Sequence, residues 1–326
     1  MEYRAPLSNC PRSTRYRVVD TSFCSQIARA HTDDMAGTAT EASCWLLIED
    51  PSPWARKAVE GAAWYSEIAD AVQQWRAEVP ALRIQLIRRA LTTRDPRGTI
   101  RCAVLRAGID PVVHARRVSD YADVAALDVP QLLRRGPSTL PEAPLVLTCT
   151  NGRRDACCAK WGRPVAKAVQ QAHPEGAWQT SHLGGHRFAP TVLVLPSGMH
   201  YGWLDAEAMP TVVAAHQEQT VYSLPHCRGR VTQKRPVQAA CVALRKRLHC
   251  TALDDGTGHI VAHPHESVWQ VAVQMQGRTH QARVQAEPGP VFRHSCRSDT
   301  PKPSTVWEVA WDVDRQLAQR GAKNPD

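Results

Sequence analysis

The sequence predicts an α/β protein made of two similar halves and a smaller C-terminal α+β region. Three observations indicate this fold. Short apolar runs alternate with Ala-rich stretches, the same order of elements restarts after a Pro- and Gly-containing stretch near residue 140, and alternating segments dominate the last third. With 326 residues, of which 43% are hydrophobic, the chain can bury a large core without disulfides. We expect a flexible arm and three folded regions, over residues 1–20, 21–140, 141–225 and 226–326.

Residues 21–140 contain predicted strands and one long predicted helix. The apolar run Cys44–Glu49 predicts a buried strand, and the Ala-rich segment Trp54–Trp75 predicts a helix. Residues 119–142 hold a short predicted helix near Val129 and then Gly and Pro residues, so we interpret them as a linker. Further strands are predicted over residues 82–87, 99–105 and 112–118.

Residues 141–225 repeat the order of the first half. Their predicted elements are a strand at 145–149, a helix at 157–172, a strand at 178–181, a hairpin of 191–195 and 200–204, and a helix at 205–219. Strand, helix, strand, hairpin, helix is the order of a thioredoxin-like layer. The predicted fold is therefore a thioredoxin-like domain preceded by a related α/β half.

Residues 226–326 predict a smaller α+β region. Pro236–Leu248 is expected to be a basic helix, because Pro is tolerated in a first helical turn. Residues 268–275 and 279–286 predict a hairpin, and residues 307–312 predict a third strand. We interpret the basic triplets Arg228-Gly229-Arg230 and Arg245-Lys246-Arg247 as a solvated face, with docking of an acidic redox partner as the alternative.

Composition narrows the class of protein. The net charge is +9, but the sequence has no run of five Lys or Arg and only 6% aromatic residues, which argues against nucleic-acid binding. The longest apolar runs are far shorter than the ~20 residues that cross a bilayer, and the N-terminus has no apolar signal segment. We therefore expect a cytoplasmic protein with no membrane contact. In such a reducing compartment the 11 cysteines should not form a disulfide framework.

Two local patterns carry donor atoms for metals. The first is a group of three cysteines, Cys149, Cys157 and Cys158, which are the only cysteines that lie close together in the sequence. The second is His182-Leu-Gly-Gly-His186. Thiolates and imidazoles together suit zinc or an iron–sulfur cluster. The Cys-x8-Cys spacing does not match a zinc finger, and the chain has no Cys-x-x-Cys redox motif.

The expected positions of these residues favour metal binding. Cys149 ends a predicted strand, and Cys158 lies in the first turn of the next helix, where the helix dipole favours a thiolate. Gly184 and Gly185 exclude a stable helix between the two histidines, so we expect a tight loop that approaches a ligand closely.

The motifs resemble those of the sucrase/ferredoxin-like family, whose members are similar to thioredoxin-like ferredoxins. The resemblance covers most of the chain and is carried by Gly37-Thr-Ala39, Trp45–Glu49, Pro53-Trp54, Cys149, Arg154-Asp155, Cys158, His182–Thr191, Tyr201-Gly202, Arg228–Arg230 and Ser295-Cys296. It implies a [2Fe-2S] cluster held by Cys149, Cys158, His182 and His186. The Arg154-Asp155 register favours Cys158 over the adjacent Cys157 as a ligand.

Such a ligand set predicts an electron-transfer protein whose donor and acceptor proteins are unknown. Acidic partners are the alternative that the basic triplets raise. Neutral imidazoles in place of thiolates raise the reduction potential, and their second nitrogens couple electron transfer to pH. Glycoside hydrolysis would need two placed carboxylates, and no acidic pair in the sequence is singled out. Two alternatives stay open: a zinc-stabilised α/β interaction module that uses the same residues, and a metal-free thiol oxidoreductase.

Overall fold

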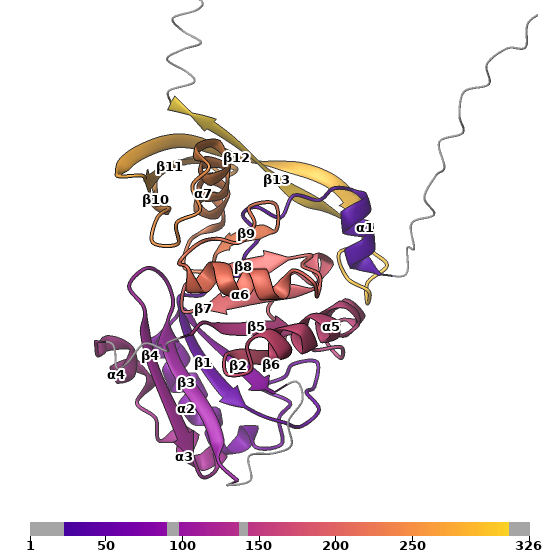
Figure 1. The fold of residues 1–326 in the computed structure, drawn as a ribbon, viewed down its shortest axis with the longest axis vertical. Coiled ribbons are helices and arrows are strands. Elements are labelled where there is room, and N and C mark those ends of the chain that lie inside the picture. Colours follow the sequence, from indigo (N-terminus) through magenta and orange to yellow (C-terminus); the bar gives the residue numbers. More distant parts are fainter. Residues whose placement is uncertain (1–22, 90–97, 137–142, 313–326) are drawn as a thin grey trace, which may run out of the picture.

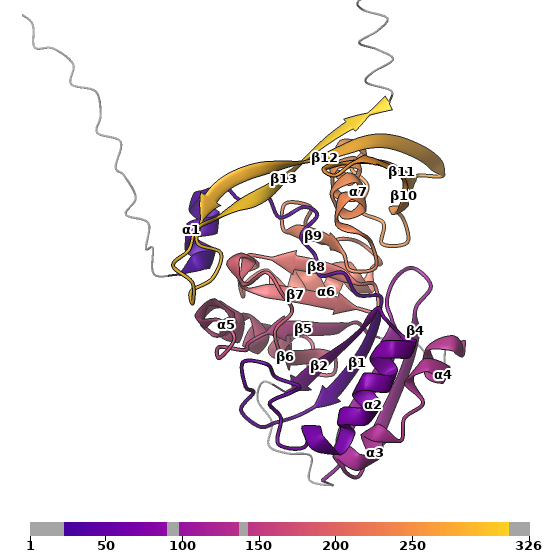
Figure 2. The same ribbon diagram turned by 180° about the vertical axis from the view of Figure 1, so that it is seen from behind.

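The computed structural model describes residues 23–89, 98–136 and 143–312. They form a nine-stranded mixed sheet with helices and a four-stranded antiparallel sheet at the C-terminal end (Figures 1 and 2). The strand order of the large sheet is β4-β3-β1-β2-β6-β5-β7-β8-β9. Among the described residues, no helix combines the length and apolar character that a bilayer crossing requires. The mixed α/β fold is as predicted from the sequence.

The first half of the large sheet is built around β1. Strand β1 pairs in parallel with β2 and antiparallel with β3, and β3 pairs antiparallel with β4. Helices α2, α3 and α4 pack against this half, so residues 119–136 of the segment interpreted as a linker are folded onto the core. Its last residues, 137–142, lie outside the described residues. The element bounds are β1 (Cys44–Glu49), α2 (Tyr65–Glu78), β2 (Leu82–Arg88), β3 (Ile100–Arg106), β4 (Val112–Val118), α3 (Tyr121–Ala125) and α4 (Val129–Arg134).

The second half repeats these pairings around β5. Strand β5 pairs in parallel with β6 and antiparallel with β7, and β7 pairs antiparallel with β8. The halves join where β2 meets β6. The element bounds are β5 (Leu145–Cys149), α5 (Ala156–Ala172), β6 (Ala177–Thr180), the 3₁₀ turn η1 (His186–Phe188), β7 (Thr191–Leu195), β8 (Met199–Gly202) and α6 (Met209–Gln217).

The predicted helix Trp54–Trp75 was wrong at its start, because α2 begins at Tyr65. The preceding segment is held by two indoles that both bind Asp50. The Trp54 Nε1–H donates to the Asp50 carbonyl oxygen at 3.0 Å, and the Trp64 Nε1–H donates to the Asp50 carboxylate at 3.3 Å. Because both indoles are buried in the first-half core, the chain between them turns instead of continuing as a helix.

The C-terminal region forms a second, separate sheet beside the β9 edge of the first. Helix α7 packs between β9 and the four-stranded sheet β10-β11-β12-β13, and α1 lies beside the connection from β12 to β13 in both views (Figures 1 and 2). The predicted hairpin corresponds to β11 and β12, whereas β10 was not predicted. The bounds are α1 (Cys24–Ala30), β9 (Cys227–Arg230), α7 (Arg235–Leu248), β10 (Thr257–His265), β11 (Val268–Met275), β12 (Arg278–Phe292) and β13 (Lys302–Trp311).

The interpretation of the basic triplets as a solvated face was wrong for three arginines. Arg228, Arg230 and Arg245 are each at most 3% exposed. Their guanidinium groups donate to backbone carbonyl oxygens of neighbouring loops. A guanidinium has five donors, so it can satisfy several loop carbonyls at once inside the protein. These arginines therefore hold loops in place and do not present a docking surface.

His216 in α6 makes the stability of the fold depend on pH. Burial, with a contribution from the charge of Arg230, lowers the pKa of His216 to about 3, and its Nε2 lies 2.8 Å from the Tyr201 hydroxyl oxygen. An unfolded histidine has a pKa of about 6.5, so below that pH the unfolded chain binds a proton that the folded protein does not. Stability is therefore lost as pH falls from about 6.5 towards 3, by about 1.4 kcal/mol per pH unit.

We expect the free energy of unfolding of the wild type to fall by about 2 kcal/mol more between pH 6.5 and 5 than that of His216→Gln. Urea denaturation at the two pH values measures the difference. His259→Gln, in which an exposed histidine of β10 is replaced, is the matched control and should keep the wild-type pH dependence. Equal pH dependence in the wild type and His216→Gln would contradict this account.

Candidate metal centre

The two candidate thiols lie at the junction of β5 and α5. Cys149 is the last residue of β5, and the Asp155 side chain caps α5 by accepting a hydrogen bond from the Cys157 N–H at 3.0 Å. This cap begins the helix at Ala156 and therefore places Cys158 in its first turn, as predicted. Cys149 and Cys158 are both buried.

Gly162 allows α5 to approach β5 closely. A Cβ at position 162 would lie 2.1 Å from the carbonyl oxygen of Cys149, which is a backbone atom that cannot move independently. We expect Gly162→Ala to push α5 away from β5 and to lower the free energy of unfolding by about 1–3 kcal/mol, although alanine is the better helix former. Denaturant unfolding measures this loss. Gly136→Ala is the control because its Cβ would meet open space, and a similar effect in both variants would refute the prediction.

Three of the four predicted ligands converge. The His182 Nδ1 lies 3.9 Å from the Cys149 Sγ and 3.7 Å from the Cys158 Sγ, and the three ligand atoms all lie within 4.8 Å of one another. The neighbouring Cys157 is not a member of this group. Its thiol lies instead beside Cys24 and Cys296, two cysteines that the sequence analysis did not connect with a metal site.

His186 lies at the edge of the group. Its ring centroid is 5.2 Å from that of His182, and its Nε2 is 3.5 Å from the Asp155 carboxylate. The His186 Nδ1 is buried and has no hydrogen-bond partner among the residues that the structure describes. A buried nitrogen without a partner loses the free energy of hydration, unless it binds a ligand. His186 therefore fits the role of a fourth donor.

The loop between the histidines requires glycine. Gly184 and Gly185 have φ values of +97° and +70°, and a Cβ at position 185 would lie 2.3 Å from a terminal nitrogen of Arg228. The Arg228 side chain donates to the Gly184 carbonyl oxygen at 3.0 Å, and Arg83 donates to the His182 carbonyl oxygen at 2.6 Å. The expected tight, non-helical loop is confirmed, and Arg83 and Arg228 hold it through hydrogen bonds to its carbonyl oxygens.

The charges of the site favour binding of a cation by thiolate. The hydrogen bond from Cys158, supported by His182, lowers the pKa of the Cys149 thiol well below its ordinary value. The same hydrogen bond and burial raise the pKa of Cys158, so the pair shares one proton. Burial lowers the pKa of His186, against the effect of Asp155, and keeps this imidazole neutral. A metal would displace the remaining thiol proton.

The partly buried Arg83 and the buried Arg228 add positive charge around the loop. Burial lowers the pKa of Arg83 to about 10 and that of Arg228 to about 9, and the anionic Cys149 partly opposes both shifts. Both guanidinium groups therefore stay charged at neutral pH. Their charge stabilises negative charge on the thiol pair, because opposite charges attract strongly away from water.

Residues 35–229 match the model of the sucrase/ferredoxin-like family. The chain belongs to this family. Searches of curated proteins and of solved structures each gave no match. The sucrase/ferredoxin-like match begins before β1 and ends in β9, so it includes all four candidate ligands but neither Cys24 nor Cys296.

The structure identifies a second group of donors that the sequence analysis missed. In this member of the sucrase/ferredoxin-like family, two groups within the described residues have ligand atoms close enough to hold a metal ion. One contains Cys149, Cys158 and His182, and the other contains Cys24, Asp155, Cys157 and Cys296. The position of Asp155 directly before an Ala-rich helix is a recognisable N-cap signal. Its second role, beside remote cysteines, has no local signal in the sequence.

Proposed function

We propose that this chain is an electron-transfer protein in which Cys149, Cys158, His182 and His186 bind a [2Fe-2S] cluster. The observation that carries the proposal is the convergence of two buried thiols and the His182 imidazole beside the unpartnered Nδ1 of His186. Membership of the sucrase/ferredoxin-like family supports it. The strand order of the second half, β6-β5-β7-β8 with α5 and α6, supports a thioredoxin-like ferredoxin domain.

When bound, the cluster supplies the capacity to take up and release one electron. Two thiolates and two neutral imidazoles carry two fewer negative charges than four thiolates, which favours electron uptake and gives a higher potential than in four-cysteine ferredoxins. Arg83 and Arg228 act in the same direction, because their positive charges beside the loop stabilise an added electron. The low pKa of His186 keeps its imidazole available as a neutral ligand.

His182 offers a route for the electron. Its side chain is partly exposed and lines a cavity of about 240 Å³ together with Arg56, Arg76, Arg83 and one acidic residue, Glu60, which pairs with Arg76 at 3.3 Å. An electron that enters or leaves at His182 therefore crosses a basic surface. We propose that donor and acceptor proteins present acidic side chains at this cavity, and that the association weakens as ionic strength rises.

The test is the composition and spectrum of protein purified without oxygen from iron-replete cells. The proposal predicts brown protein with iron and acid-labile sulfide at about two each per chain, and a rhombic EPR signal after reduction. Colourless protein without iron would refute it. Zinc bound by these four residues would instead support the α/β interaction module, and free thiols without metal would support the thiol oxidoreductase.

The proposed ligands also predict pH-coupled reduction. The His186 Nε2 lies 3.5 Å from the Asp155 carboxylate, whereas the His182 side chain is partly exposed to solvent. We therefore propose that the proton coupled to the electron is lost at His182. Loss of that proton is favoured in the oxidised state, so the potential should fall by about 59 mV per pH unit above the oxidised-state pKa. EPR redox titration between about pH 6 and 10 measures this slope. His182→Cys should lower the potential and remove most of the slope, and a wild-type slope in that variant would contradict the assignment.

A further inference from the structure

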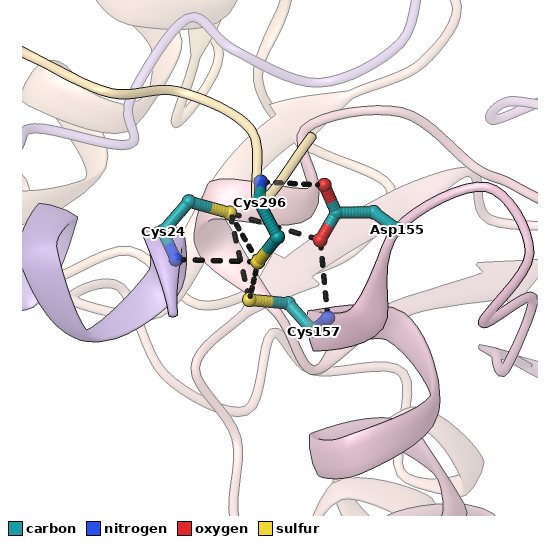
Figure 3. Close-up of side chains that lie close together, drawn as sticks. All are labelled: Cys24, Asp155, Cys157 and Cys296. Atoms are coloured by element: carbon teal, nitrogen blue, oxygen red, sulfur yellow. Dashed lines mark hydrogen bonds between the residues drawn. The ribbon is translucent and has the colours of Figure 1, made fainter. Parts of the chain in front are cut away.

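Three cysteines from remote parts of the chain meet at the start of α5. Cys24 is the first residue of α1, Cys157 lies in the first turn of α5, and Cys296 lies in the connection between β12 and β13. Their sulfur atoms are 3.5 Å apart for Cys24 and Cys157, 3.2 Å for Cys157 and Cys296, and 3.6 Å for Cys24 and Cys296. Figure 3 shows the three thiols directed toward one another, with Asp155 beside them.

These distances match one metal ion better than a disulfide. Zinc–sulfur bonds of about 2.3 Å in a tetrahedron place sulfur atoms about 3.8 Å apart, close to all three observed separations. A disulfide needs about 2.05 Å between two sulfurs and would leave the third thiol without a role. Three nearly equal separations are the arrangement that a single bound ion requires.

Asp155 supplies a buried oxygen donor beside the three thiols. Its carboxylate is fully buried, and its Oδ1 lies 3.8 Å from the Cys24 Sγ. The Cys296 N–H and the Ser295 hydroxyl both donate to its Oδ2 at 2.9 Å, which fixes the orientation of the group. The same oxygen lies 3.5 Å from the His186 Nε2. Buried carboxylates are normally paired with a cation or bound to a metal.

We propose that Cys24, Cys157, Cys296 and Asp155 bind one zinc ion, separately from the residues proposed to hold the cluster. Three thiolates and one carboxylate complete a four-coordinate set with no open position, which is the pattern of a structural zinc site. The ion would join α1 and the β12–β13 connection to α5. This proposal does not depend on the cluster, because it uses none of the four cluster ligands and two of its thiols lie outside the family match.

The experiment measures zinc and iron in full-length protein purified from cells supplied with both metals. The wild type is expected to hold about one zinc per chain, and Cys24→Ser and Cys296→Ser should lose it. Cys44→Ser removes another buried cysteine and should retain zinc. Cys149→Ser should also retain zinc even where it loses iron, which separates this proposal from that of the cluster. Zinc that persists in both Cys24→Ser and Cys296→Ser, or that disappears in Cys149→Ser, would overturn the proposal.

Two further measurements test the zinc site even if the serine variants do not fold. Cys296→His keeps a zinc donor at the same position and should recover zinc binding, whereas Cys296→Ser should not. In the wild type, Cys24, Cys157 and Cys296 should resist alkylation until a chelator removes the metal, as read by peptide mass. Zinc-free wild-type protein, or a mass that shows a disulfide between two of these cysteines, would refute the site.

Discussion

Cys158→Ser should abolish iron binding, while the change at the next residue, Cys157→Ser, should leave it intact. The Cys158 Sγ lies 3.7 Å from the His182 Nδ1, whereas the Cys157 thiol lies with Cys24 and Cys296. A serine hydroxyl does not ionise at neutral pH and is a poor substitute for a thiolate on iron. Iron analysis and the visible spectrum of the two variants, purified side by side without oxygen, measure the effect.

The two variants serve as controls for each other. They alter adjacent residues of one helical turn, and both side chains are buried, so a general loss of folding would affect both. The zinc proposal adds the opposite expectation, in which Cys157→Ser loses zinc and Cys158→Ser keeps it. Loss of iron in Cys157→Ser together with its retention in Cys158→Ser would reverse the assignment of the ligands.

Asp155→Ala should reduce the free energy of unfolding by about 3–5 kcal/mol. The carboxylate is fully buried and accepts hydrogen bonds from the Cys157 N–H, the Cys296 N–H and the Ser295 hydroxyl. Alanine would leave one buried donor and two partly buried donors without an acceptor and would remove the cap of α5. Denaturant unfolding in the presence of a chelator measures this loss without a contribution from bound metal.

Asp128→Ala is the matched control for this prediction. Asp128 caps α4 in the same way, by accepting a hydrogen bond from the Gln131 N–H at 2.8 Å, but it is exposed and makes no comparable set of contacts. Loss of that cap should cost about 1 kcal/mol. If Asp155→Ala were no more destabilising than Asp128→Ala, the carboxylate would be only a helix cap.

Strands β1 to β8 of the large sheet could be predicted because their signals are local, whereas the edge strand β9 was not predicted. The apolar run at Leu145–Cys149 and the Ala-rich segment after it specify a strand and a helix without reference to the rest of the chain. The start of α2 could not be predicted in this way. It depends on Asp50, which holds the indoles of Trp54 and Trp64 and so keeps the intervening segment out of the helix.

In the candidate site, too, the residues that lie close together in the sequence could be predicted, and those that meet only in the folded protein could not. Cys149, Cys158 and His182 lie within a short stretch of one strand, one helix and one loop, and their spacing is visible in the sequence. The buried arginines were not predictable, because Arg228 binds backbone carbonyls and carbonyls leave no pattern in the sequence. Nor was the approach of Cys24 to Cys296, which are separated by 272 residues.

This long separation orders the loading of the two proposed sites during synthesis. The four proposed cluster ligands lie within one continuous stretch between Cys149 and His186, so they leave the ribosome together. Cys296 is added 139 residues after Cys157. If both proposals hold, a growing chain can receive iron while the zinc site still lacks a ligand. Zinc binding would then mark the stage at which the connection between β12 and β13 has been made and has docked onto α5.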